Sequence, residues 1–263
     1  MAEGGALLRR YTGLNPYRGF ESLSLRQILL GAAAALFLAA SPATADTSNQ
    51  FWPELDAYFG LGERMRLYLM TTASRAEQTA SQSGEASVQD MQLGAHLDVT
   101  LTPAFRRTLV EGDWQRNRYL WMRIGYRYGR SLGDLEAADP YREHRGIFEL
   151  TGRTPPLAGG LEYVSRIRWD SRDVNDVHSN RYRLRLQVEK SLSYDGRAVV
   201  PFVNAEAFYD TRYDAWIRER YQVGAEFQLS PRWRIEPSLA YQSDERATPA
   251  RIHALALALK YFH

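Results

Sequence analysis

Apolar and polar side chains alternate with a two-residue period along most of this chain. In 91–101 every odd-numbered residue is apolar, and the residues between them include His96 and Asp98. Segments 181–189 and 218–229 alternate in the same way, with mostly charged residues on the polar side. Successive side chains of a β-strand point to opposite faces of the sheet. The pattern predicts strands with one apolar and one charged face, of about the ten-residue length typical of transmembrane barrels.

Eleven such segments predict an all-β fold, an antiparallel up-and-down transmembrane β-barrel. Bacterial single-chain barrels have even strand numbers, so we expect twelve strands, with ten as the alternative. The odd number of predicted segments would be explained if residues 46–59 cross the lumen and do not join the wall, or if 103–115 contains a further strand pairing. The predicted strands are 51–59, 64–72, 91–101, 118–128, 144–151, 161–170, 182–189, 199–209, 219–229, 233–242 and 252–262.

The connections between the predicted strands differ in length. Membrane barrels place short turns in the periplasm and long loops outside the cell. We therefore expect short turns at one end of the barrel and long polar loops at the other. The short turns are 60–63, 193–197 and 230–232, and the long loops are 73–88, 129–143, 171–179 and 243–250.

Residues 1–45 have the character of an export signal with a long region before its apolar run. The run from Ile28 to Ala40 carries no charge, and a small-residue cleavage pattern ends at Ala45 before Asp46. A membrane span needs about 20 apolar residues, so this run is too short for an anchor. We expect cleavage between Ala45 and Asp46, a start codon assigned too far upstream, and a barrel formed by 46–263.

Composition excludes several classes of function. The chain has no cysteine, which excludes disulfides and thiolate metal sites. The whole chain has 33 basic and 31 acidic residues, and residues 1–45 contain four of the basic and two of the acidic ones. The chain after residue 45 therefore has no net charge, and its charge gives no reason to expect nucleic-acid binding. Arginine supplies all the basic residues except Lys190 and Lys260. Arginine suits the binding of carboxylates and phosphates, but codon bias in a GC-rich genome is the better explanation of this imbalance.

Aromatic residues and the last strand support an outer membrane in a Gram-negative bacterium. Trp169 and Tyr126 fall toward the predicted loop ends of their strands, and Trp233 toward a turn end, as expected at a membrane interface. Segment 252–262 resembles the C-terminal signal read by the barrel-assembly machinery, with His263 in place of the usual terminal aromatic residue. We expect outer-membrane lipid, lipopolysaccharide, the assembly machinery and small anionic solutes as partners.

Four short motifs resemble a family of bacterial outer-membrane barrels known only as a domain of unknown function. They are Arg181-Tyr182-Arg183-Leu184-Arg185, Pro201 through Glu206 to Phe208, Arg220 through Gly224, and Gln242-Ser243-Asp244-Glu245. The resemblance covers roughly 51–262. It implies a barrel fold and an outer-membrane location, and it implies no chemistry.

The polar faces of the strands predict a lumen with thirteen basic and nine acidic residues. One interpretation is a water-filled pore that favours anions, since rings of charge set selectivity in channels. The other is a narrow barrel filled by arginine–carboxylate pairs, because unpaired charge away from water costs several kcal/mol. The residues assigned to this lining are Arg64, Arg66, Arg123, Arg127, Arg166, Arg168, Arg181, Arg183, Arg185, Glu189, Glu206, Arg218, Arg220, Glu226 and Arg234.

Nothing in the sequence identifies a catalytic, metal or cofactor site, and we expect no enzyme activity. Barrel enzymes that act on lipids use a His and a Ser two residues apart on one strand face, where the base reaches the hydroxyl. Here His178 and Ser179 are adjacent and should point to opposite faces. The leading hypothesis is a small, weakly anion-favouring channel or a structural envelope component. The alternatives are a barrel enzyme acting on lipid or lipid A, and a soluble periplasmic β-protein.

Overall fold

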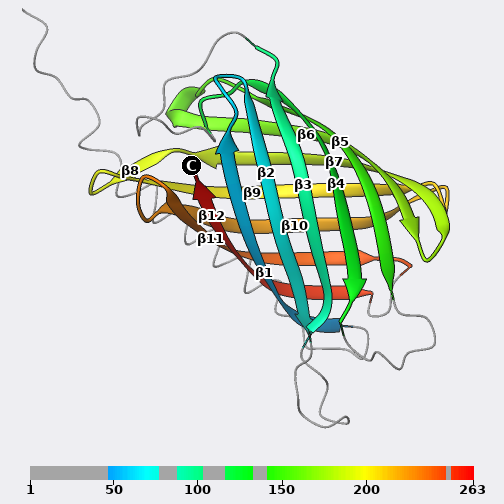
Figure 1. The fold of residues 1–263 in the computed structure, drawn as a ribbon. Helices are drawn as coiled ribbons and strands as arrows, with labels where there is room; N and C mark the ends of the chain where they lie inside the picture. Colours follow the sequence, from blue (N-terminus) through cyan, green and yellow to red (C-terminus); the bar gives the residue numbers. More distant parts are fainter. Residues whose placement is uncertain (1–46, 77–87, 103–115, 133–140, 247–249) are drawn as a thin grey trace, which may run out of the picture. The chain divides into compact units, whose positions relative to one another are not determined.

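The computed structural model describes residues 47–76, 88–102, 116–132, 141–246 and 250–263. The predicted cleavage site at Ala45 and Asp46 lies outside these residues, and so does the 103–115 connection. Eleven strands form a closed wall in which each strand pairs with the next along the chain (Figure 1). They are β1 (Thr47–Gly60), β2 (Met65–Ala76), β3 (Val88–Thr100), β4 (Leu120–Ser131), β5 (Arg142–Arg153), β6 (Leu161–Val174), β7 (Val177–Lys190), β9 (Arg197–Asp210), β10 (Ala215–Gln228), β11 (Trp233–Asp244) and β12 (Arg251–Phe262).

The wall closes where β1 pairs with β12, and this pairing is parallel (Figure 1). Its register runs from Thr47 opposite Arg251 to Tyr58 opposite Phe262, so the seam extends along nearly the whole of both strands. The other neighbouring pairs in the wall are antiparallel. When strand direction reverses at every step, the first and last of an odd number run the same way. The parallel seam therefore follows from eleven wall strands.

The sheet formed by the described residues has twelve strands, as predicted, but one of them is not part of the closed wall. This strand, β8 (Leu192–Tyr194), pairs with the start of β9 and prolongs the β7–β9 hairpin in the same register beyond Ser191. The eleven wall strands coincide with the eleven segments identified by alternation. Residues 47–60 join the wall and do not cross the lumen, so the even-number rule misled the count of wall strands.

The C-terminal residue completes the seam. The backbone nitrogen of His263 donates to the carbonyl of Tyr58 at 2.9 Å, and its ring stacks on Tyr261 with a centroid distance of 6.5 Å. Its ring also lies 6.0 Å from that of Phe59 on β1. The histidine thus contacts aromatic rings of both strands at the seam.

Burial alternates along the strands with the predicted period. In β5 the odd-numbered residues from Glu143 to Thr151 are buried, whereas even-numbered ones such as Phe148 and Leu150 are exposed. Large exposed apolar side chains occur on this outer face around the wall. Examples from separate strands are Leu93, Ile124, Ile167, Leu186, Val203 and Leu255. The barrel is polar inside and apolar outside, the reverse of a water-soluble protein.

One predicted long loop is a tight turn instead. The sequence predicts a polar loop over 171–179, but β6 runs to Val174 and β7 starts at Val177. Asn175 and Asp176 both have positive φ, at 49° and 64°, which fits the two-residue type I′ turn of a hairpin. Helical structure in the described ranges is the single 3₁₀ turn η1 (Ala158–Gly160). No helix in these ranges is long and apolar enough to cross a membrane.

The parallel seam can be tested by cross-linking, because the native chain contributes no cysteine. Phe51 lies opposite Leu255 and Leu55 opposite Leu259, with Cα spacings between neighbouring strands that suit a disulfide. We expect both double variants, Phe51→Cys with Leu255→Cys and Leu55→Cys with Leu259→Cys, to cross-link on mild oxidation, as read by gel mobility. An antiparallel seam about the same centre would instead cross-link Phe51→Cys with Leu259→Cys, and that result would refute parallel closure.

Candidate functional site

Charges of opposite sign face one another across neighbouring strands inside the barrel. Asp98 on β3 lies opposite Arg66 on β2 and Arg123 on β4. It accepts hydrogen bonds from Arg66 at 2.6 and 2.8 Å and from Arg123 at 2.6 and 3.1 Å. Glu149 on β5 continues the row, opposite Arg123 and Arg168 and 4.0 Å from the nearest guanidinium nitrogen of each. The sheet register therefore supplies the ion pairing.

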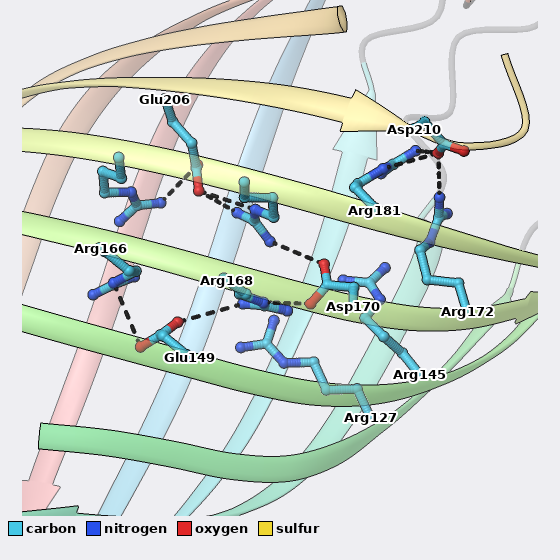
Figure 2. Close-up of polar contacts among 12 residues, drawn as sticks. Arg127, Arg145, Glu149, Arg166, Arg168, Asp170, Arg172, Arg181, Glu206 and Asp210 are labelled. Atoms are coloured by element: carbon cyan, nitrogen blue, oxygen red, sulfur yellow. Dashed lines mark hydrogen bonds and ion pairs between the residues drawn. The ribbon is translucent and has the colours of Figure 1, made fainter. Parts of the chain in front are cut away.

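Three further carboxylates are each shared by two arginines, as Figure 2 shows for part of the network. The groups are Asp170 with Arg168 and Arg183, Glu206 with Arg183 and Arg185, and Asp210 with Arg172 and Arg181. In the Glu206 group the nitrogen–oxygen distances are 2.8 and 2.9 Å. The Asp170 and Glu206 groups share Arg183, so charges of β6, β7 and β9 are linked through it, whereas Asp210 holds Arg172 and Arg181 in a group of its own.

A cavity of about 520 Å³ lies inside the barrel beside this network. Eleven arginines and Lys260 line it, against the four carboxylates of Glu54, Asp56, Asp90 and Glu236. The other interior carboxylates are set back from it. Asp98 and Asp170 have no exposed surface, whereas the Arg166 side chain keeps 28% and the Arg218 side chain 22%. The surface of the cavity is therefore much more positive than the balance of charges inside the barrel.

Side-chain length explains this difference. An aspartate or glutamate carboxylate stays close to the strand that carries it, whereas a guanidinium stands several bonds farther from the backbone. When the two pair on neighbouring inward positions, the carboxylate lies against the wall and the guanidinium reaches toward the axis. An interior with nearly equal numbers of both signs thus presents cations to its cavity.

Two cavity arginines are held by neutral acceptors. Arg127 donates from Nε to Nε2 of His96 at 3.2 Å, and Arg220 donates from Nε and Nη2 to the side-chain oxygen of Gln242 at 3.0 and 2.6 Å. Arg220 also lies over the Trp52 ring, 4.9 Å from its centroid. Within the described part of the chain neither guanidinium forms an ion pair. Both are held in place without being neutralised.

Glycines provide the space for His96. Its ring stacks on Tyr68 with a centroid distance of 4.9 Å. A Cβ added at Gly94 would lie 2.7 Å from His96 Cε1 and 3.0 Å from Arg127 Cγ, and one added at Gly125 would collide with the imidazole ring. The imidazole must be neutral to accept from a guanidinium, which is a donor only. These contacts fix His96 as the acceptor for Arg127.

The interior near the β1–β2 turn contains a second cluster. Tyr58 stacks on Tyr68 and on Phe262 at centroid distances of 4.7 and 4.8 Å. Near it, Glu226 accepts from Lys260 at 2.9 Å and from Arg234 at 3.0 Å. Aromatic packing and ion pairs together fill part of the barrel at this end.

Two buried arginines, Arg116 and Arg118, lie outside the strands. Arg118 precedes β4, and burial together with the nearby Arg66 guanidinium lowers its pKa to about 10. It therefore stays charged at neutral pH and adds to the positive interior.

The structure places fourteen of the fifteen predicted lining residues on the inward face of the wall, and the exception is Arg64, exposed in the turn between β1 and β2. Glu189, Glu206, Glu226 and Arg234 are buried in ion pairs behind the cavity surface. The remaining ten line the cavity: Arg66, Arg123, Arg127, Arg166, Arg168, Arg181, Arg183, Arg185, Arg218 and Arg220. Their role in a pore stays a prediction.

Several residues of the network were missed from sequence. Arg145 and Glu149 share the inward face of β5, and applying the parity rule to that strand would have found them. Arg172 and Asp210 lie just beyond the predicted ends of their strands, which are longer than the alternation indicated.

The candidate catalytic residues do not assemble a catalytic group. His178 is exposed and the neighbouring Ser179 is buried, so they face opposite sides of the wall as expected. His96 and Asp98 share the inward face, but Asp98 is engaged by two arginines. Among the described residues no group of three or more His, Asp or Glu could hold a metal ion.

The network predicts that Glu206 is important for stability. Glu206→Gln leaves Arg183 and Arg185 without their shared charge, and breaking a buried pair costs about 3–5 kcal/mol. We expect a clear fall in the temperature at which the purified barrel unfolds in detergent. Glu219→Gln is the matched control, because Glu219 is exposed and contacts Tyr221 on the outer face. Equal midpoints for the two variants would contradict a stabilising network.

Comparison with known proteins gives a family. No curated protein matches the chain. The structure is similar to two bacterial outer-membrane barrels. LpxR from Salmonella typhimurium is 12% identical, with a TM-score of 0.45, over 74% of this chain and 83% of that one. The siderophore receptor PirA from Pseudomonas aeruginosa is 15% identical, with a TM-score of 0.27, over 71% of this chain and 32% of its own length, so this chain spans about a third of it.

The family is shown by a sequence match over most of the chain. The match covers residues 49–253 and includes all four motifs singled out in the sequence. This protein belongs to the family described as protein of unknown function, DUF2490.

Proposed function

We propose that this protein is a non-enzymatic outer-membrane barrel of a Gram-negative bacterium that passes small anions as a weakly selective channel. The observation that carries the proposal is the cavity lining, in which twelve cationic side chains outnumber four carboxylates. A water-filled space with such a lining lowers the energy of an anion inside it.

The outer face supports the membrane location. Apolar side chains as exposed as Ile167 at 61% and Leu186 at 58% lie on the outward face of the wall. A soluble protein rarely exposes contiguous apolar surface beyond a few hundred Å². Aromatic residues such as Trp233 and Tyr261, in contact at 4.9 Å, lie at the turn end, where a membrane interface favours them. Lipid and lipopolysaccharide are the expected partners of this face.

The cavity supports the solute class. Its volume of about 520 Å³ is within the range of pockets that take small molecules, about 300–1,000 Å³. Guanidinium groups match carboxylate and phosphate oxygens in geometry as well as charge. Small carboxylates and phosphates are therefore the expected solutes, ahead of cations or neutral sugars.

The ion-pair network favours a second candidate, a structural envelope component. The connected charges of β6, β7 and β9 fill space that an open pore would leave to water. A barrel with this interior can be stable without conducting, so conductance decides between the two roles.

Membrane location is tested by cell fractionation. We expect the protein in the outer-membrane fraction, with a band that shifts on heating before denaturing electrophoresis, because closed barrels resist detergent until heated. Recovery from the soluble periplasm without a heat-dependent shift would favour a soluble β-protein and overturn the proposal.

Channel activity is tested in planar bilayers under a potassium chloride gradient. We expect measurable conductance with a reversal potential that indicates preference for chloride. Replacing Arg183→Ala together with Arg185→Ala removes two lining cations and should reduce the preference. Arg142→Ala is the control, since this arginine is exposed and pairs with Asp176 outside the cavity. No conductance, or a preference unchanged in the double variant, would leave the structural role.

A further inference from the structure

We propose that the lumen contains a defined binding site for a small multivalent oxyanion, formed by the guanidinium groups of Arg127, Arg145 and Arg168. The inference deepens the proposed function and rests on it, because the anion has to enter the lumen. It goes further in assigning three residues on β4, β5 and β6 to one ligand. The ligand chemistry is a cluster of phosphate or carboxylate oxygens.

The strand register brings the three arginines together. Arg127 lies directly opposite Arg145, and Arg168 lies on the next strand, β6, opposite Glu149. All three line the cavity. Figure 2 shows Arg127, Arg145 and Arg168 around one part of the lumen, with Asp170 between Arg145 and Arg168 in this view, and the charges of Arg145 and Arg168 both act on Arg127.

The acidic partners do not neutralise the group. Arg145 pairs with Glu143 at 2.5 Å, and Arg168 pairs with Asp170 at 2.5 Å and with Glu149 at 4.0 Å. Each of these carboxylates also pairs with an arginine outside the cluster. Arg127 has the neutral His96 as its acceptor. The cluster therefore keeps the full charge of Arg127 beside two further cations.

One arginine of the cluster has an unused donor. Nη2 of Arg168 is buried and has no hydrogen-bond partner among the described residues, and the whole residue is only 4% exposed. A buried donor without a partner costs free energy. Like charges directly opposite each other, as in Arg127 and Arg145, also destabilise a sheet. An oxyanion among the three groups accepts from the free donor and removes the repulsion.

His96 is the positioning residue for this site. It holds Arg127 through a neutral nitrogen, and Gly94 and Gly125 leave free the space that its ring occupies. A carboxylate at this position would hold Arg127 equally well and cancel its charge. A neutral amide would hold it and keep the charge. Substitutions at 96 therefore separate the electrostatic role from a structural one.

The test is calorimetric titration of the purified full-length barrel in detergent at low ionic strength. Inorganic pyrophosphate and citrate are the two probes, so that a phosphate preference and a carboxylate preference are read separately. Only variants that keep the heat-dependent gel shift are compared. We expect saturable binding of one equivalent of at least one probe.

Four variants give the decisive comparison. Arg127→Gln should weaken binding at least tenfold, and His96→Glu should do the same although Arg127 is still present. His96→Gln should stay within about threefold of the parent, a free-energy change of about 0.65 kcal/mol, because the amide keeps a neutral acceptor beside Arg127. Arg220→Gln removes another cavity charge that a neutral acceptor holds, on β10 and outside the cluster, and should have a much smaller effect than Arg127→Gln.

Three results would overturn the site. The first is that neither probe binds saturably. The second is an equal loss of affinity in Arg127→Gln and Arg220→Gln, which would mean that the anion is attracted only by the general positive charge of the lumen. The third is an equal loss of affinity in His96→Glu and His96→Gln. The outcome is separable from that of the channel. Conductance without binding removes the site and leaves the channel, whereas binding without conductance supports the site and removes the channel.

Discussion

The structure depends on pairing arginine with aspartate or glutamate across neighbouring inward positions of the wall. A charge inside a barrel loses much of its water, and an unpaired one would cost several kcal/mol. Asp98 between Arg66 and Arg123 shows how the register meets this requirement without a loop or a helix. Given such pairs, the interior can be charged throughout and the apolar residues are left for the outer face.

The same pairing gives the lumen its sign. Carboxylates on short side chains lie against the wall, and guanidinium groups on long side chains face the cavity. Nearly equal numbers of acidic and basic residues therefore give a cavity surface on which cations predominate. The arginines without an ion pair add to this. Arg127 and Arg220 are fixed by His96 and Gln242, which orient a guanidinium and leave its charge in place.

Closure is a separate constraint on the fold. Eleven strands that alternate in direction return to the first one running parallel to it, so β1 and β12 must accept the slanted hydrogen bonds of a parallel pair. His263 and the ring contacts around Tyr261 stabilise the end of this seam. The general rule of even strand numbers applies to barrels that close with an antiparallel pair of strands. This barrel closes with a parallel pair.

The sequence by itself determined the eleven wall strands, the face that each turns inward and the family, because a two-residue period and local motifs are properties of contiguous residues. It also identified most lumen arginines; Arg172 and Asp210 lie where strands run beyond their alternation, and Arg145 and Glu149 follow from the parity of their strand. Three things belong to the tertiary structure alone: the parallel seam, the partner of each charge, and the meeting of Arg127, Arg145 and Arg168. Each depends on register between strands, and a register is fixed only when the barrel closes and side chains from distant segments compete for the same partners.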